Sequence, residues 1–281
     1  MGEDRAGAAG LRAKNGPSGA EDAAAEAARA DPLFIAAIER AMRVLETVSA
    51  NHAPMSLTEI AAASGLGKSA AQRLTHTLSG LGYLRKDPET RRYAMTVRAL
   101  DLAHGFLSAD PMINNGLLHL IDARERNGET VNMGRLDGTD FIYVVRLPAR
   151  RMNVAAALIG RRQPAYCASG GRAILSRMDP AEAEALIDSR PLRALTPMTL
   201  TDRGAVLERI EQARREGFSA TDQEVLLGEL AVSAPITDRN GAPVGAVQSS
   251  VSTASWTLEM VRERLAPRVM ETARLISAPR Y

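Results

Sequence analysis

Apolar residues three or four positions apart dominate the first folded segment of the chain, and this spacing predicts a helix with one apolar stripe. The stripe consists of Ile35, Ile38, Met42, Leu45 and Val48. A second helix is predicted after Ser56, because Ser56 and Glu59 stand at the spacing of a capping box, and it ends around Ala63. A third helix is predicted over 68–81, and it stops at Gly82.

The pattern then changes to short strands. Residues 84–86 and 91–94 are predicted to pair as a hairpin through the turn sequence DPET. A connecting helix is predicted over 96–108 and ends before Pro111.

The second half of the chain mixes hairpins and helices. One hairpin is predicted to turn at Asp137-Gly138 and another at Asn240-Gly241, each flanked by strand-forming residues. Helical patterns cover 112–127, 170–177, 180–188, 202–216 and 257–277. Hairpins separated by helices, without steady strand–helix alternation, favour an α+β fold around an antiparallel sheet. No GxGxxG follows a strand, which disfavours a dinucleotide-binding sheet.

Composition restricts the class of protein further. The formal net charge is only +2, so any case for nucleic-acid binding has to be local. The single cysteine, Cys167, excludes an internal disulfide and fits a reducing compartment. No apolar run approaches the ~18 residues of a membrane span, and the N-terminus lacks the apolar core of a signal peptide. We therefore expect a cytoplasmic protein that does not enter a membrane.

The third predicted helix has two chemically different faces. At 100° per residue its apolar arc is predicted to pack on the first two helices, and the opposite arc is rich in hydrogen-bond donors. The apolar arc contains Ala70, Ala71, Leu74, Leu78 and Leu81, and the donor arc contains Lys68, Ser69, Gln72, Arg73 and His76. Two helices joined through Gly65 form a helix-turn-helix whose second helix would enter the major groove of DNA.

The donor arc and the hairpin suit different parts of a duplex. Gln72 and Arg73 can pair with base edges, with Ser69 beside them, whereas Lys68 and His76 suit phosphates. The hairpin would act as a wing against the adjacent DNA backbone, since it holds four basic residues against Asp87 and Glu89. These basic residues are Arg85, Lys86, Arg91 and Arg92.

Each of these features has an alternative interpretation, because any exposed helix face is polar and a run of arginines is commonly just solvated. What favours DNA binding is their order along the chain: a capping box, a tight glycine turn before a donor-rich helix, and then a basic hairpin.

The segment LTEIAAASGLGKSAAQRLTHTLSGLGYLRKD resembles the winged-helix domain of IclR-type transcriptional regulators, and the resemblance continues over nearly all of 34–278. Further matches are YVVRLPARR, GRRQPAYCASGGRAILS, LTPMTLTDRGAVLERIEQARREGFSATDQE and LAVSAPITDRNGAPVGAVQSSV. Residues 1–31 are rich in Ala, Gly and Glu and have almost no large apolar side chains, so we expect them to form a flexible tail. The resemblance implies three further parts: a winged helix-turn-helix domain (32–94), a linker helix (95–110) and a GAF-like effector-binding domain (111–278). It also implies a homodimer or homotetramer on double-stranded operator DNA and a small organic acid as effector, with an aromatic acid preferred.

The effector site is carried over from the resemblance by position. Gly170 and Gly171 would supply backbone contacts at a helix start, although without the resemblance a close helix–sheet contact is the better explanation for them. The other positions are Thr221 or its neighbour Asp222, then Ala231, Gln248 and Ser250. Asn132, Tyr143 and Arg146 on the first hairpin are further candidates, and Arg146 could pair with a carboxylate, although an arginine at a strand end is more often a surface ion-pair partner.

Two positions depart from the family pattern. Gly67 stands where a serine-like helix cap is usual, and Glu229-Leu230-Ala231 replaces a segment that usually contains arginine.

Catalytic, metal-binding and cofactor-binding sites are not expected. The four histidines are scattered without metal-ligand spacing, and the sequence has neither a P-loop nor GxSxG. The alternatives to a regulator are a metabolite-binding protein or small-molecule enzyme with a vestigial winged helix, and a protein–protein adaptor.

Overall fold

The structure is a computed structural model that describes residues 27–149 and 159–277. The chain divides into two compact units, Met1–Phe106 and Leu107–Tyr281. Most of the predicted tail, up to residue 26, lies outside the described residues. Its last part is helical at 27–29, where Arg29 forms an ion pair of 2.6 Å with Glu39.

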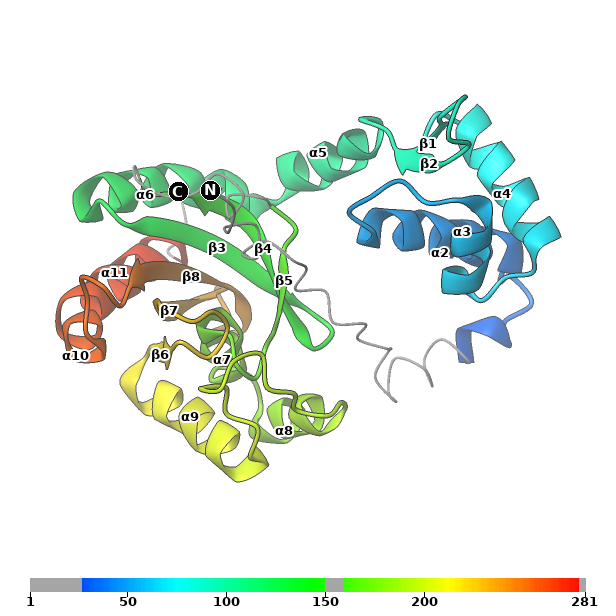
Figure 1. The fold of residues 1–281 in the computed structure, drawn as a ribbon. Coiled ribbons are helices and arrows are strands. Elements are labelled where there is room, and N and C mark those ends of the chain that lie inside the picture. Colours follow the sequence, from blue (N-terminus) through cyan, green and yellow to red (C-terminus); the bar gives the residue numbers. More distant parts are fainter. Residues whose placement is uncertain (1–26, 150–158, 278–281) are drawn as a thin grey trace. The chain divides into compact units, whose positions relative to one another are not determined.

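Between residues 36 and 95 the first unit contains three helices and a two-stranded hairpin (Figure 1). The helices are α2 (Ala36–Ala50), α3 (Leu57–Ser64) and α4 (Lys68–Gly80), and the strands are β1 (Leu84–Lys86) and β2 (Tyr93–Met95). The predicted capping box is present, because the Glu59 amide donates to Ser56 Oγ and the Ser56 amide donates to the Glu59 carboxylate. Gly65 has a φ of 66°, so a left-handed residue makes the turn between α3 and α4.

The predicted apolar stripe of the first helix is wrong in its N-terminal half. Val44 and Val48 are buried in the core of this unit, whereas Ile35, Ile38 and Met42 are exposed. The core made by α3, α4 and the hairpin reaches only the C-terminal half of α2, so an apolar spacing alone could not show which part is covered.

The predicted packing of the third helix is also wrong at one end. Leu81 follows the last turn of α4 and is 52% exposed, while Thr75 is fully buried, with its Oγ1 donating to the Gln72 carbonyl.

The second strand of the hairpin starts at Tyr93, two residues later than predicted, because Asp87 and Arg92 extend the turn.

The two units are connected through α5 (Ala99–Ala109), which has no buried residue. The second unit contains a six-stranded antiparallel sheet with the strand order β5-β4-β3-β8-β7-β6. Its strands are β3 (Thr130–Asp137), β4 (Asp140–Leu147), β5 (Arg162–Pro164), β6 (Ser219–Asp222), β7 (Glu229–Thr237) and β8 (Pro243–Ser252).

Both predicted hairpins are confirmed, with Asp137 opposite Asp140 and a left-handed Gly241 in the second turn. The α+β class and the antiparallel sheet are confirmed as well. The short strands β5 and β6 at the two edges were not predicted.

Helices cover both faces of this sheet (Figure 1). One face packs against α6 (Pro111–Asn127) and the C-terminal helix, which runs through α10 (Leu258–Met260), the π-helical turn η2 (Val261–Leu265) and α11 (Ala266–Ser277). The other face packs against α7 (Ser169–Leu175), with α8 (Pro180–Asp188) and α9 (Arg203–Glu216) outside it.

A β-bulge in β4 changes which side chains share a face. Met133 pairs with Val145 and Gly134 pairs with Tyr143, so Val144 is an extra residue on β4. Val144 and Val145 both lie in the core beneath α6 and α11. Because of this extra residue, Tyr143 and Arg146 both lie on the face that packs against α7, although they are three residues apart.

Candidate nucleic-acid interface and ligand site

The exposed face of α4 carries the donors that the sequence predicted. All five predicted donors are exposed: Lys68, Ser69, Gln72, Arg73 and His76. Ala71 and Leu78 are buried on the opposite face. No acidic residue occurs between Glu59 and Asp87, so the outer surface of α4 has no intrinsic negative charge to repel a phosphate.

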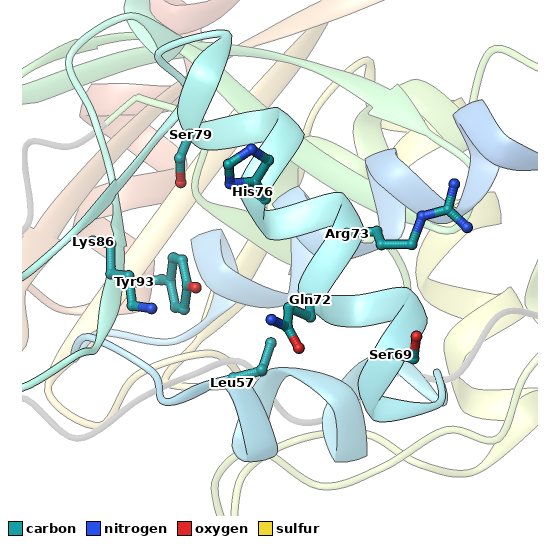
Figure 2. Close-up of a pocket in the computed structure, with 8 residues that line it drawn as sticks. All are labelled: Leu57, Ser69, Gln72, Arg73, His76, Ser79, Lys86 and Tyr93. Atoms are coloured by element: carbon teal, nitrogen blue, oxygen red, sulfur yellow. The ribbon is translucent and has the colours of Figure 1, made fainter.

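A groove of about 570 Å³ lies between α4 and the hairpin (Figure 2). Its lining residues are Leu57, Ser69, Gln72, Arg73, His76, Ser79, Lys86 and Tyr93. Figure 2 shows Gln72 and His76 on the side of α4 that faces Lys86 and Tyr93, whereas Arg73 extends away on the other side. The groove therefore brings together α4 and the hairpin, and its lining contains basic and neutral polar side chains but no acidic one.

The tip of the hairpin is held by one aspartate. Asp87 Oδ1 accepts hydrogen bonds from the Glu89 amide at 3.0 Å and from the Thr90 amide at 2.7 Å. These hydrogen bonds, led by those from Thr90, lower the pKa of Asp87. Arg91 follows with a φ of 60° and is exposed, which presents its guanidinium at the tip of the turn.

The four predicted basic residues of the hairpin differ in their surroundings. Arg85 and Arg91 are exposed, and the Lys86 ammonium lies 5.3 Å from the centre of the Tyr93 ring. Arg92 is engaged internally, because its Nη1 donates to Glu59 Oε2 at 2.9 Å and to the Pro54 carbonyl at 2.7 Å. Arg92 therefore fixes the hairpin against the start of α3, and its charge is compensated.

In the second unit, two cross-strand rows of residues lie on the sheet face that packs against α7. The first row follows the register Arg146, Asn132, Gln248, Ser233 across β4, β3, β8 and β7. The second row follows Thr130, Ser250, Ala231, Thr221 across β3, β8, β7 and β6. The rows bring together six of the ten predicted effector residues, which come from five strands.

A chain of hydrogen bonds crosses the first row. Asn132 Nδ2 donates to Gln248 Oε1 at 3.0 Å, and Gln248 Nε2 donates to Ser169 Oγ at 3.1 Å. Ser169 Oγ lies 2.8 Å from Ser233 Oγ. All four side chains are buried, so this network links the start of α7 to the middle of the sheet.

Polar atoms at one end of this row have no partner among the described residues. They are Asn132 Oδ1, Arg146 Nε and Arg146 Nη1, and all three are buried. The Arg146 guanidinium lies over the Tyr143 ring, 4.3 Å from its centre. Arg146 is half-buried, and burial lowers its pKa. Buried donors and acceptors without partners are costly, and a bound ligand is one way of satisfying them.

Tyr143 itself is fixed within the core. Its hydroxyl donates to Gln163 Oε1 at 3.0 Å, and burial raises its pKa to about 12. The phenol is therefore neutral, and its ring supports the Arg146 guanidinium.

A steric constraint requires the two glycines at the start of α7. A Cβ on Gly170 would lie 2.4 Å from Phe141 Cζ, and one on Gly171 would lie 2.4 Å from the Ala165 Cα and carbonyl oxygen. The close helix–sheet contact, which the residues alone favoured, is therefore present. It explains the glycines without a ligand.

Of the alternatives Thr221 and Asp222, only Thr221 lies in a row. Asp222 is on the opposite face of β6, where it lines a separate cavity of about 260 Å³ with Glu216 and Arg262. Ala231 is buried and has no polar side chain, and Ser250 is its neighbour in register.

Comparison with known proteins identifies both units. A family model described as IclR helix-turn-helix domain matches residues 37–88, and a model described as bacterial transcriptional regulator IclR C-terminal matches residues 111–278. The chain belongs to the IclR family of transcriptional regulators. The family model of the C-terminal domain alone covers more than half of the chain, so this membership does not depend on any single motif.

Individual IclR-family relatives cover most of the chain. The Pca regulon regulatory protein of Pseudomonas putida is 28% identical over 87% of this chain and 84% of its own length. The transcriptional repressor IclR of Escherichia coli is also 28% identical, over 82% of this chain and 84% of its own length. A solved Rhodococcus sp. RHA1 protein, described as a transcriptional regulator, has a TM-score of 0.75 and 29% identity, over 87% of this chain and 97% of that one.

The structure shows the surroundings of the two positions at which the sequence analysis expected this IclR-family chain to depart from the family pattern. Gly67 begins α4 without a side-chain cap. Glu229 lies on β7 with Ala231 and Ser233, at alternating positions, so it shares the face of the two rows.

Other kinds of site find little support in the described residues. Burial raises the pKa of Cys167 to about 12, which does not suit a nucleophile. Among residues 27–149 and 159–277, no cluster of three metal-ligating side chains occurs. In the same residues, no helix has the length and apolar character needed to cross a membrane.

Sequence reasoning missed a buried ion pair in this IclR-family domain. Arg172 Nη1 and Nη2 donate to the two Glu224 carboxylate oxygens, each at 2.7 Å, and Arg172 Nε donates to the Tyr166 carbonyl. The two residues are 52 positions apart. A charged residue in an otherwise small and apolar stretch, GGRAIL, was the signal that could have revealed a buried arginine.

Proposed function

We propose that this chain is a transcriptional regulator that binds double-stranded operator DNA through α4 and the β1–β2 hairpin and responds to a small carboxylic acid bound in the second unit. The observation that carries the DNA-binding half is the groove between α4 and the hairpin, which combines donors from both elements and has no acidic lining residue. Family membership supports the same function.

Within this interface we assign different tasks to different residues. Ser69, Gln72 and Arg73 lie in the N-terminal half of α4, the part of a recognition helix that meets base edges. Lys68, His76, Arg85, Lys86 and Arg91 suit phosphates. Arg92 is assigned a supporting role, because Glu59 already compensates its charge.

Replacing Arg73 by Ala tests the recognition face. A bidentate contact to a base edge is worth about 1–3 kcal/mol, so the R73A variant should bind its operator more weakly and discriminate less at one base position. Footprinting upstream of the neighbouring genes would supply the operator. R40A is the matched control, because Arg40 is exposed on α2 and does not line the groove. Equal losses in both variants would contradict the assignment.

Salt dependence separates this function from the alternatives. The affinity of a regulator for its operator falls steeply as salt rises, because counterions are released from the phosphates. R91A should make the slope of log affinity against log salt less steep by about the contribution of one phosphate contact, whereas R92A should leave the slope nearly unchanged. A metabolite-binding protein, an enzyme or a protein–protein adaptor would show no such specific, salt-dependent binding.

The acid-binding half of the proposal is supported by the unpartnered donors of Arg146 beside the buried amide row. The name of one relative refers to an aromatic acid: the p-hydroxybenzoate hydroxylase transcriptional activator of Acinetobacter baylyi is 26% identical over 85% of this chain and 90% of its own length. An aromatic acid is therefore our preferred effector class.

A ligand would act by changing the population of two arrangements of the protein on DNA. To change operator occupancy tenfold, it has to bind one arrangement more tightly by about 1.4 kcal/mol, which a few charge-assisted hydrogen bonds supply. R146Q should abolish the effect of the acid on operator binding and leave operator binding without acid intact. Loss of both would contradict a separate effector site.

We also propose that the protein is a homo-oligomer. Two elements of the first unit expose apolar surface that a partner chain could cover: Leu33, Ile35 and Ile38 at α2, and Leu100, Leu102 and Phe106 on α5. A symmetric pair of recognition helices would bind half-sites about one turn of DNA apart. Sedimentation of the full chain tests this proposal, and a monomer at all concentrations would refute it.

A further inference from the structure

The polar side-chain contacts that join the β1–β2 hairpin to the rest of the first unit converge on Arg92. Its Nη1 donates to Glu59 Oε2 at 2.9 Å and to the Pro54 carbonyl at 2.7 Å, and its Nη2 donates to Glu59 Oε1 at 3.4 Å. In the described part of this unit, no other side chain of 84–95 has a hydrogen bond or an ion pair outside the hairpin. Apolar packing of Leu84 fixes the base of the hairpin in the core, and Arg92 holds the part next to its tip.

The Glu59 carboxylate serves two elements at once. Its Oε2 accepts the hydrogen bond from Arg92 and another from the Ser56 amide at 2.7 Å, which closes the capping box of α3. From Arg92 the hydrogen bonds continue to the tip of the hairpin, because the Asp87 amide donates to the Arg92 carbonyl at 2.8 Å. The start of α3 and the tip of the hairpin are therefore joined through Glu59 and Arg92.

The position of the hairpin determines the shape of the groove that we assign to DNA. Lys86 and Tyr93 line one side of the groove, and Gln72 and His76 line the other (Figure 2). Tyr93 directly follows Arg92, so a displacement of Arg92 would change the spacing between the two sides. Hydrogen bonds to base edges weaken steeply when their distances and angles change, whereas the attraction between a basic side chain and a phosphate is long-ranged. Loss of position should therefore reduce discrimination between DNA sequences more than general affinity for DNA.

The pair formed by Glu59 and Arg92 is exposed and carries no net charge. The exposed fractions of the two side chains are 42% for Arg92 and 49% for Glu59. An exposed ion pair contributes little to the free energy of unfolding, so variants of either residue should remain folded. A change in their DNA binding would then report on the position of the hairpin and not on unfolding.

We propose that Glu59 and Arg92 form a clamp that sets the position of the hairpin relative to α4, and that both are positioning residues for discrimination between operator and unrelated DNA. This inference rests on the proposed DNA-binding function and deepens it. The clamp gives Glu59, an acidic residue that would repel a phosphate, a role in recognition. It gives Arg92 a role other than contact with DNA.

The ratio of the affinity for the operator to the affinity for an unrelated duplex of the same length tests the clamp. Both affinities are measured by fluorescence anisotropy with the full chain at one salt concentration, on the operator located by footprinting. E59Q and R92A should each lower this ratio about three- to fivefold, which is the size of effect expected from an exposed ion pair. The double variant E59Q/R92A should lower the ratio no further, because both substitutions remove the same contact.

The charge changes of the two variants cannot mimic this result. E59Q makes the protein more positive and R92A makes it more negative, so a purely electrostatic effect on DNA binding would have opposite signs in the two variants. Loss of position lowers the ratio in both.

Two control variants separate the clamp from a general loss of structure. S56A removes the side-chain cap of α3 and leaves the contact between Glu59 and Arg92 in place, so it should lower the melting temperature but keep the ratio. R203A removes a similarly exposed arginine that is paired with two carboxylates in the second unit, and it should have the wild-type ratio. E59Q should melt closer to wild type than S56A does, because glutamine also serves at this position of a capping box.

Each other outcome decides against the clamp. A ratio that E59Q or R92A leaves unchanged, changes of opposite sign, or a double variant whose loss is the product of the two single losses would overturn the role of the pair. An S56A variant that loses discrimination as E59Q does would overturn it as well, because the effect would then follow the stability of α3. If the wild-type protein has no preference for the operator, the proposed DNA-binding function itself fails. If that preference is present and the clamp variants keep it, only this inference fails.

Discussion

Arg172 and Arg203 show how burial changes what a bidentate arginine contributes to the domain. Arg172 is fully buried and its partner Glu224 is nearly so, whereas Arg203 binds Asp188 and Glu184 at the surface. Removing one member of a buried pair leaves an uncompensated charge in a medium of low polarity. Surface pairs are screened by water.

We therefore expect R172A to lower the free energy of unfolding of the second unit by about 3–5 kcal/mol. R203A, the control, should cause a much smaller loss. Replacing both partners in R172M/E224L should recover much of the loss, because no isolated charge remains. Chemical denaturation of the full chain measures all three, and an R172A loss no larger than that of R203A would contradict this account.

The glycines on either side of Leu66 have opposite conformational requirements. Gly67 has a φ of −64° and begins α4, while Gly65 has a φ of 66°, and a Cβ at either position would meet no atom within 4 Å. Only the backbone conformation therefore distinguishes the two substitutions.

G67S should stabilise the first unit by about 0.5–1 kcal/mol, since serine caps the free amides of α4 and restricts the unfolded chain. G65S should destabilise it by about 1 kcal/mol, because it forces a side chain into the left-handed region. Thermal unfolding of the two variants tests the sign of each effect, and two changes of the same sign would be incompatible with this explanation.

At the scale of the elements, local signals predicted most helices and both hairpins, because capping boxes and Asp-Gly or Asn-Gly turns act over a few residues. The edge strands β5 and β6 have three and four residues, which is too short for a recognisable alternation pattern. They form because they pair with the neighbouring strands of the sheet. The exposed half of α2 was missed for a similar reason, since periodicity describes a face but not what covers it.

The candidate site was predictable only in part. Alternation on β8 placed Gln248 and Ser250 on one face, and the structure has them there. The contact of Arg146 with Tyr143 depends on a bulge, which no alternation pattern shows. The role of Ser169 and Ser233 depends on contact between α7 and β7, which are 64 residues apart along the chain at these serines.

The position of α7 depends on the absence of a side chain at Gly170. G170A should displace α7 from β4 and cost about 1–3 kcal/mol, because a methyl group at 2.4 Å from Phe141 cannot be accommodated without movement. G105A, in α5, is the control: a Cβ there meets no atom within 4 Å, so alanine should preserve or increase stability. Calorimetric unfolding would measure both, and a neutral G170A would mean that α7 tolerates displacement.

At the scale of the whole molecule, each unit has its own hydrophobic core. The second unit should therefore fold as a fragment of residues 107–281.

We expect this fragment to unfold cooperatively and to bind the same acids as the full chain, with no affinity for the operator. Circular dichroism and calorimetry would test it. A fragment that is folded but no longer binds acids would show that the first unit completes the ligand site.

The extra residue Val144 also bears on how this protein can change over evolution. Deleting that valine would restore strict alternation along β4 and leave Tyr143 and Arg146 on one face, because they would then be two residues apart. A deletion at a regularly alternating position would instead turn every side chain on one side of it to the opposite face of the sheet. Loss of one valine of the Val144–Val145 pair should therefore be accepted by selection more readily than loss of any other residue in this strand.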